Sequence, residues 1–191
     1  MARLRLDTSR AALPDEVGVV ARERPFLGHL NLRGRQDDAR FGPAVAAVLG
    51  MALPVLPNTV ASDRDRAAYW LGPDEWLLVT PSDEETAVSV SLREALREVV
   101  SSITEVGSGQ TVIVLQGRKV RELLAKECPL DLFSPSFGPG ACAQTRLAKV
   151  SVLLRPLEAN QMELIVRRSF AEYVWAWCSD AGAEYGFRAG P

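Results

Sequence analysis

The chain has 191 residues, of which 47% are hydrophobic and 24% are charged, and its formal net charge is −2. This length fits one domain, or two small lobes that share a core, and requires no covalent cross-links for stability. Nucleic-acid binding is disfavoured because it requires a clustered basic face. No signal peptide is recognisable and no run of about 18 apolar residues occurs, which disfavours secretion and membrane spanning.

Three cysteines, Cys128, Cys142 and Cys178, form no C-x-x-C pair. With no disulfide framework and no secretion signal, reduced thiols in a cytoplasmic protein are expected. A cysteine nucleophile is the alternative, with Cys128 and Cys142 as the candidates, although nothing in the surrounding sequence marks either as activated.

The first half of the chain begins with an expected N-terminal arm, residues 1–16, in which charged residues alternate with small ones. Period-two and helical spacings of apolar residues then separate strands from helices. The predicted elements are, in chain order, strands at 17–21 and 28–33, a helix from 37 or 38 to 49, a hairpin at 67–80, a helix at 82–99 and a strand at 103–106. The first helix is expected to end at Gly50, because glycine readily adopts the left-handed conformation that closes a helix.

The hairpin is the strongest local signal. Two apolar, aromatic-rich runs flank the turn Gly72–Glu75, and this combination is typical of paired β-strands. Ser82 with Glu85 three residues later predicts a capping box, so the hairpin should lead directly into a helix. The adjacent acids Asp74 and Glu75 are expected either to solvate the turn or to pair with an arginine of a partner.

The second half continues with predicted elements in a similar order. They are a strand at 111–116, a helix at 118–126, a long loop at 127–146, strands at 148–154 and 162–167, and a helix at 170–181. Loops as long as 127–146 are usually functional, covered by a partner or disordered. Ser169 and Glu172 predict a second capping box.

The two halves therefore share one order of elements: strand, helix, strand, strand, capped helix. They span about 28–99 and 111–181, and Leu32–Arg35 in the first corresponds to Leu115–Arg118 in the second. Each has the order of a ferredoxin-like split βαβ motif. We predict an α+β fold with two repeated βαββα units and antiparallel or mixed sheets, forming a single domain at 17–187.

Signals of catalysis are weak. His29 is the only histidine, which excludes most histidine-based zinc sites and acid–base relays and leaves packing or a polar partner contact. Gly107–Gln110 precedes a strand rather than a helix, so a turn is favoured over a phosphate cradle. The tryptophans and neighbouring aromatics are interpreted as core or interface, with an aromatic cofactor box as the less favoured alternative. No catalytic, cofactor-binding or metal-binding residue is predicted.

Five segments carry a family resemblance: Leu71–Leu78, Val106–Ile113, Cys128–Leu132, Phe137–Thr145 and Arg167–Trp177. Together they resemble the gamma subunit of heterotetrameric sarcosine oxidase, and the resemblance covers about residues 17–187. That family is similar to the folate-binding fold of the glycine-cleavage aminomethyltransferase, which agrees with the repeat. In those relatives an acidic residue lies at the pterin, and Asp63 and Asp65 are candidates for a related position or for solvated loop charges.

The resemblance implies a complex that oxidatively demethylates sarcosine to glycine, forming hydrogen peroxide and formaldehyde or 5,10-methylenetetrahydrofolate. It implies an alpha subunit with NAD and a tetrahydrofolate site, a beta subunit with FAD and FMN, and a delta subunit with zinc. The present chain is then a structural subunit that contacts mainly alpha, and contact surfaces are expected at the 127–146 loop, the arm and the aromatic hairpin. The alternative is a free-standing folate-binding or one-carbon-transfer protein of the same fold.

Overall fold

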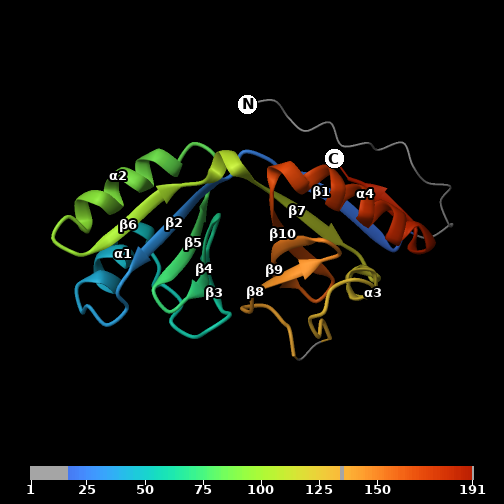
Figure 1. Ribbon diagram of the computed structural model, residues 1–191, viewed down its shortest axis with the longest axis horizontal. Coiled ribbons are helices and arrows are strands. Elements are labelled where there is room, and N and C mark those ends of the chain that lie inside the picture. Colours follow the sequence, from blue (N-terminus) through green and yellow to red (C-terminus); the bar gives the residue numbers. More distant parts are fainter. Residues whose placement is uncertain (1–16, 134–135, 191) are drawn as a thin grey trace. The chain divides into compact units, whose positions relative to one another are not determined.

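A computed structural model describes residues 17–133 and 136–190 of the chain (Figure 1). The predicted arm at 1–16 lies outside the described residues. The fold divides into two compact units. The middle unit is Phe26–Gln110, and the terminal unit joins the described residues up to Pro25 to those from Thr111 onward. No helix among the described residues has the length and apolar character needed to cross a bilayer.

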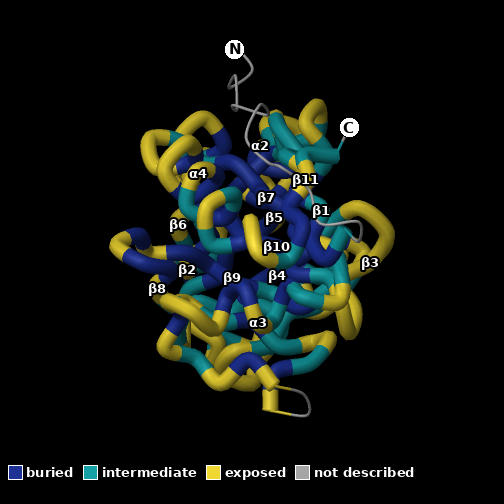
Figure 2. Tube along the Cα trace, turned by 90° about the vertical axis from the view of Figure 1, so that its right-hand side faces the viewer, coloured by how far each residue is buried: buried dark blue, intermediate teal, exposed yellow. Residues whose placement is uncertain are grey.

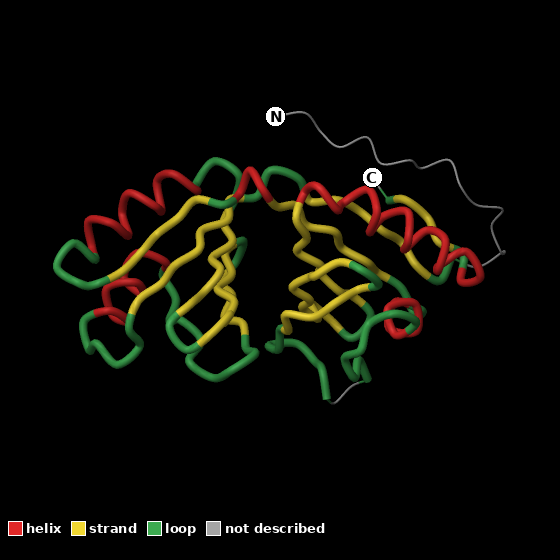
Figure 3. The backbone as a smooth tube through the Cα atoms, in the orientation of Figure 1, coloured by secondary structure: helices red, strands yellow, loops and turns green. Residues whose placement is uncertain are grey.

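The middle unit is one antiparallel sheet with two helices (Figure 3). Its elements are β2 (Gly28–Gly34), α1 (Phe41–Leu49), β3 (Val60–Asp63), β4 (Arg66–Gly72), β5 (Glu75–Thr80), α2 (Glu85–Ala95), β6 (Ser101–Glu105) and the 3₁₀ turn η1 (Gly107–Gly109). The strand order is β3-β4-β5-β2-β6, and all neighbours run antiparallel. The order and connections from β2 through β6, without the edge strand β3, are those of a split βαβ motif.

Both helices of the middle unit cover the same face of its sheet. Alternate residues of β2, Leu30 and Leu32, point into this core, as the period-two pattern requires. The ring of Phe41 from α1 lies with its centroid 5.5 Å from that of Trp76 on β5. Each large apolar side chain buried in this way contributes about 1.5–3 kcal/mol, so the helices are held mainly by packing.

The terminal unit has a six-stranded sheet with order β11-β1-β7-β10-β9-β8. Its elements are β1 (Val19–Arg24), β7 (Gln110–Gln116), α3 (Val120–Ala125), β8 (Ala143–Leu147), β9 (Val150–Glu158), β10 (Gln161–Arg167), η2 (Arg168–Phe170), α4 (Ala171–Gly182), η3 (Ala183–Tyr185) and β11 (Phe187–Ala189). Apolar residues from alternate strand positions and from both helices form its core. Buried residues run along the strands, whereas turns and outward helix faces are exposed (Figure 2).

The two units repeat one connection pattern. From β2 to α2 and from β7 to α4 the chain makes strand, helix, three strands and helix, and the sheet orders β3-β4-β5-β2 and β8-β9-β10-β7 correspond. The next strand of the terminal sheet, β1, comes from the first half of the chain, whereas that of the middle sheet, β6, comes from the same half as β2. β1 precedes β2 in sequence but pairs with β7, whereas β6 precedes β7 but pairs with β2. The units are therefore not simply consecutive in sequence.

The α+β class and the hairpin are confirmed, and Gly50 ends α1 in the left-handed conformation at φ 75°. Three strands, β3, β8 and β11, were not predicted, because each is a short strand at the edge of its sheet. The predicted loop 127–146 ends earlier than expected, because Ala143–Leu147 forms β8.

The two predicted capping boxes are wrong. α2 begins at Glu85 and α4 at Ala171, and neither N-terminus has a side-chain cap hydrogen bond. The Glu85 carboxylate instead accepts hydrogen bonds from the backbone N–H groups of His29 (3.1 Å) and Gly107 (3.0 Å). It therefore ties the first turn of α2 to the start of β2 and to η1, a role that depends on tertiary contacts.

Candidate polar site at the β4–β5 turn

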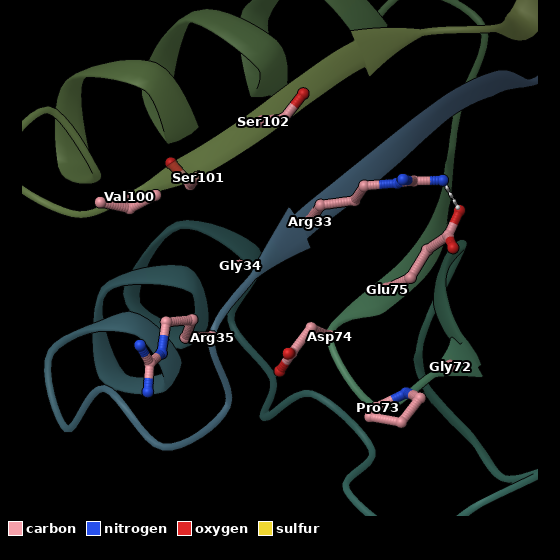
Figure 4. Close-up of a pocket in the computed structure, with 10 residues that line it drawn as sticks. All are labelled: Arg33, Gly34, Arg35, Gly72, Pro73, Asp74, Glu75, Val100, Ser101 and Ser102. Atoms are coloured by element: carbon pink, nitrogen blue, oxygen red, sulfur yellow. Dashed lines mark hydrogen bonds and ion pairs between the residues drawn. The ribbon is translucent and has the colours of Figure 1, made fainter.

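An open cavity of about 560 Å³ lies where the end of β2, the β4–β5 turn and the start of β6 come together (Figure 4). Its charged and hydroxyl-bearing lining residues are Arg33, Arg35, Asp74, Glu75, Ser101 and Ser102. The site thus contains the Gly72–Glu75 turn that the sequence analysis emphasised.

Glu75 is held by two donors from the neighbouring strand. Its Oε1 accepts hydrogen bonds from Asn31 Nδ2 (2.8 Å) and Arg33 Nη2 (2.9 Å), and Figure 4 shows Arg33 reaching across from β2. Arg33 and Glu75 are directly opposed in the β2–β5 ladder. Because the Arg33 side chain is 62% exposed, this pair orders the site but stabilises the fold by only about 0–1 kcal/mol.

Asp74 fixes the turn against the end of β2. Its backbone oxygen accepts from Gly34 N (3.1 Å), and its Oδ1 accepts from Gln36 N (2.9 Å). Gly34 has no room for a side chain, because an added Cβ would lie 2.1 Å from the Phe41 ring. The turn is therefore coupled to the packing of α1.

Arg35 extends the charged surface beyond the turn. It donates two hydrogen bonds to Asp37, from Nε at 2.9 Å and from Nη2 at 2.7 Å. The hydrogen bond from Arg35 lowers the pKa of Asp37, and the same bond raises the pKa of Arg35. Both groups stay charged at neutral pH and line a second shallow cavity beside Pro73.

The arrangement suits polar recognition. The two carboxylates of the turn already accept hydrogen bonds from groups of the same unit, and the cavity lining includes no histidine or cysteine. The site offers arginine, carboxylate and hydroxyl groups to a polar surface of matching charge.

The other candidates from the sequence lie away from this cavity. His29 is buried, with its ring Nδ1 3.0 Å from the Leu27 carbonyl oxygen. Asp63 and Asp65 are exposed at the β3–β4 turn. Across 17–133 and 136–190, no group of three or more histidine, cysteine, aspartate or glutamate side chains could hold a metal ion.

All three cysteines are buried. Burial raises the pKa of the Cys178 thiol to about 12, which disfavours the thiolate. The Cys128 sulfur lies 3.8 Å from the Thr145 hydroxyl. Their environments are those of packed side chains.

The aromatic residues belong to two separate cores. Trp76 donates from Nε1 to the Pro54 carbonyl (2.8 Å) in the middle unit. Trp175 makes an edge-to-face contact with Phe187 in the terminal unit, at 6.0 Å between ring centroids. Each therefore has a packing role within its own unit.

Two functional groupings were missed from the sequence. Arg121 on α3 donates to the Leu132 carbonyl and, at 3.0 Å, to the Phe137 carbonyl, so it anchors the long loop after α3. Desolvation lowers the pKa of Arg121. Leu132 and Phe137 are buried, and these two apolar residues were the only available signal that the loop is partly core.

The second missed grouping is the buried Glu163 on β10, which is 3% exposed. It forms ion pairs with Arg24 on β1 (3.3 Å) and Arg155 on β9 (3.9 Å). Arg155 and Glu163 are opposite each other in the β9–β10 ladder, whereas Arg24 is far from both in sequence.

The structural class of the chain is indicated by a solved structure with a similar fold. The glycine cleavage system aminomethyltransferase T from Bartonella henselae superposes with a TM-score of 0.64 over 91% of this chain and 48% of that chain. The sequence identity is 10%, so this similarity concerns the fold alone. The chain is thus an α+β protein with the aminomethyltransferase type of fold.

The family follows from closer relatives. The model of the sarcosine oxidase, gamma subunit family matches residues 33–184. Sarcosine oxidase subunit gamma from Corynebacterium sp. (strain U-96) is 32% identical over 185 residues, which cover 96% of this chain and 89% of the relative. A chain of the heterotetrameric sarcosine oxidase from Corynebacterium sp. U-96 superposes with a TM-score of 0.83 at 32% identity, covering 91% and 88% of the two chains. This chain belongs to the sarcosine oxidase gamma subunit family.

Proposed function

We propose that the chain is the gamma subunit of a heterotetrameric sarcosine oxidase and that its role there is structural. The observation that carries this proposal is the 32% identity to sarcosine oxidase subunit gamma along nearly the whole of both chains. The structural match to a chain of a heterotetrameric enzyme of that name supports it.

The complex would oxidatively demethylate sarcosine to glycine in the cytoplasm, with hydrogen peroxide and either formaldehyde or 5,10-methylenetetrahydrofolate as further products. FAD, FMN, NAD, tetrahydrofolate and zinc would be held by the other subunits. The gamma chain itself supports this division, because its cysteines and its single histidine are packed in the interior. Its exposed polar cavity is built from groups suited to recognition.

The alpha subunit is the partner we expect gamma to contact most, through alpha's folate-binding part. The polar site at the β4–β5 turn and the loop after α3 are the described surfaces we assign to such contacts. Phe133 on that loop is 62% exposed although its neighbour Leu132 is 1% exposed. An exposed aromatic residue on an anchored loop is a common interface anchor.

Co-expression with the alpha, beta and delta chains of the same source tests this proposal. The chain should elute with the other three as one species in gel filtration, and the isolated chain should show no sarcosine-dependent peroxide formation. Elution as a separate monomer in the presence of all three partners would refute the subunit role.

The alternative, a free-standing folate-binding protein, is favoured by the similarity to aminomethyltransferase in fold and in sequence. Calorimetric titration of the isolated chain with tetrahydrofolate separates the two. We expect no binding in the micromolar range, which corresponds to about 8 kcal/mol. Saturable binding at that strength would favour the alternative.

A further inference from the structure

The sheets of the two units differ at one edge. In the terminal sheet, β1 lies beside β7 and its other side is paired with β11, which runs parallel to it. In the middle sheet, β6 lies beside β2 in the same way, but β6 is the last strand of that sheet (Figure 1). Among the described residues, the middle unit therefore has no counterpart of β11.

The main-chain groups of β6 point alternately toward β2 and away from it. Val106 N donates to the His29 carbonyl at 2.7 Å, so the groups of Val106 point toward β2. In an antiparallel ladder the direction alternates from one residue to the next, so those of Ile103 and Glu105 point away from β2. In the described part of the chain, no backbone carbonyl accepts a hydrogen bond from either of these N–H groups. The outer edge of β6 is therefore open to pairing.

The terminal unit shows what occupies the corresponding edge. Ile103 and Ala21 correspond, because each lies opposite the leucine of the repeated Leu-x-Gly-Arg pattern. The carbonyl oxygen of Ala21 accepts from Gly190 N, directly after β11, at 2.7 Å. The carbonyl oxygen of Ile103 accepts from Arg93 Nη2 of α2 at 2.8 Å. A side chain thus makes the hydrogen bond that a strand segment makes in the other unit.

Arg93 is the shield of this edge. Natural proteins protect open edge strands with charges, prolines or bulges, and β6 itself contains no proline or lysine. Arg93 is exposed, and its partners among the described residues are the Ile103 carbonyl and the Ser89 hydroxyl (3.4 Å), with no carboxylate. A strand that brings a carboxylate to this edge would replace the bond to Ile103 with an ion pair.

The geometry favours a strand of a different chain over a second copy of this one. Two identical edges that pair about a two-fold axis run antiparallel, whereas β11 runs parallel to β1 at the corresponding edge. Antiparallel pairing of β6 with itself, centred on Ile103, would also bring two Arg93 side chains together. Like charges opposite each other in a ladder are destabilising.

We propose that an extended strand of the alpha subunit, the chain that gamma is expected to contact most, pairs with β6 and runs parallel to it. Main-chain hydrogen bonds to Ile103 and Glu105 form this contact, which is recognition by β-strand addition. On the helix-covered face, an apolar residue of the strand lies beside Ile103 and a carboxylate reaches Arg93. On the opposite face, polar residues lie beside the exposed Ser102 and Thr104. This inference rests on the proposed function and deepens it.

Hydrogen exchange of individual amides tests the pairing in the assembled complex. The gamma chain is measured alone and after co-purification with the alpha, beta and delta chains. The amides of Ile103 and Glu105 should exchange about tenfold more slowly in the complex. Those of Ser102 and Thr104, which already point toward β2, should change little. Equal exchange of Ile103 and Glu105 in the two samples would overturn the inference.

Proline variants test whether the main-chain hydrogen bond matters. Glu105→Pro removes an outward N–H and no bond to β2, as proline at a sheet edge allows. The matched control is Val60→Pro on β3, at the opposite edge, where the bond from Trp70 N to the Thr59 carbonyl places the Val60 N–H outward. Glu105→Pro should lower recovery of gamma with tagged alpha about tenfold, whereas Val60→Pro and Glu105→Ala should be recovered normally. Normal recovery of Glu105→Pro would contradict the proposed pairing.

A charge variant covers the case in which Glu105→Pro does not fold, which thermal unfolding of the isolated chains identifies. Arg93→Glu places a carboxylate opposite the expected carboxylate of the partner strand, and recovery with tagged alpha should again fall about tenfold. Arg97→Glu, an exposed position that follows the same helix, is its control and should be recovered normally. Equal recovery of the two charge variants would overturn the inference.

The exchange measurement also identifies other occupants. Slow exchange of Ile103 and Glu105 in the isolated chain would assign the edge to the chain itself, or to a second copy if the protection requires high protein concentration, and either result overturns the inference. Protection that persists in a complex lacking alpha overturns the choice of alpha. Failure of wild type to bind any of the other three subunits refutes the proposed function, and this inference with it.

Discussion

The middle and terminal units have the same order of connected elements, but the side chains packed inside them differ. Gly34 and Gly117 each come at the end of the first strand of their unit, yet they are required for different reasons. Gly34 leaves space for the Phe41 ring, whereas Gly117 has φ 142° and an added Cβ would lie 2.1 Å from the Gly18 carbonyl oxygen. The repeated sequence pattern therefore reflects the same topology in both units. The side-chain contacts that require glycine differ between them.

The units also differ in where their charges lie. The terminal unit contains the buried carboxylate of Glu163 between two arginines. The middle unit has its Arg33–Glu75 and Arg35–Asp37 pairs exposed, at the end of β2 and in the loop that follows it. The buried ion pairs of Glu163 therefore affect the stability of the fold. The exposed ion pairs of the middle unit are accessible to a partner.

The largest effect should come from breaking the buried charge cluster. Glu163→Ala leaves Arg155, whose side chain is only 14% exposed, without one of its carboxylate partners. Removing one partner from a buried pair costs about 3–5 kcal/mol. The matched control is Glu94→Ala, which removes an exposed pair with Arg97 and should cost less than about 1 kcal/mol. Equal urea midpoints for the two variants would contradict this difference.

Replacing either of two nearby glycines of the middle unit, Gly34 and Gly42, with alanine should change the free energy of unfolding, but in opposite directions. Gly34→Ala forces a methyl group against the Phe41 ring and should destabilise by about 1–3 kcal/mol. Gly42→Ala, inside α1, meets nothing within 4 Å and should stabilise by about 0.5–1 kcal/mol through helix propensity. Denaturant unfolding measures both, and a neutral Gly34→Ala would show that the Phe41 ring moves freely.

A loss of stability similar to that of Gly34→Ala is expected at Glu85. Glu85→Ala removes the acceptor of two backbone N–H groups and should cost about 1–3 kcal/mol, whereas Glu85→Gln keeps one acceptor oxygen and should cost less. Hydrogen exchange at the amides of His29 and Gly107 is the direct measurement. Unchanged exchange in Glu85→Ala would show that the carboxylate does not hold these amides.

The smallest effect on stability is expected at Asp38, where the stabilising contribution of the carboxylate should depend on pH. Hydrogen bonds from the Arg40 side chain and backbone lower the pKa of Asp38 from 3.8 to about 2. Its stabilising contribution is therefore fully present above the unfolded pKa and is lost as pH falls through about 2. The stability difference between wild type and Asp38→Asn should shrink over this window. An NMR titration midpoint of Asp38 near 3.8 would disagree.

The sequence predicted the elements that depend on local periodicity. The hairpin and the helix that ends at Gly50 follow from spacing and turn chemistry, whereas the predicted order of elements lacks β3 in the first half and β8 in the second. The predicted capping boxes failed because Glu85 is used by distant backbone groups. The pairing of β1 with β7 in the other half of the chain was not predictable, because strand pairing carries no local signal.

The candidate site was only partly predictable, for the same physical reason. The Gly72–Glu75 turn stands out in the sequence, but its partners Asn31, Arg33 and Gln36 are brought to it by the β2–β5 ladder. The Glu163 cluster joins the β9–β10 pair to β1, and β7 lies between β1 and β10 in the sheet. Such sites appear only once the sheet order is known.

One measurement tests the central claim that this chain is a structural subunit of a sarcosine-oxidising complex. The chain carries an affinity tag in its native host, and sarcosine-dependent peroxide formation is assayed in the eluted and the unbound fractions. The account predicts that the activity elutes with the tagged chain, and that the chain stripped of its partners has none. Activity that stays entirely in the unbound fraction, while the tagged chain elutes alone, would contradict it.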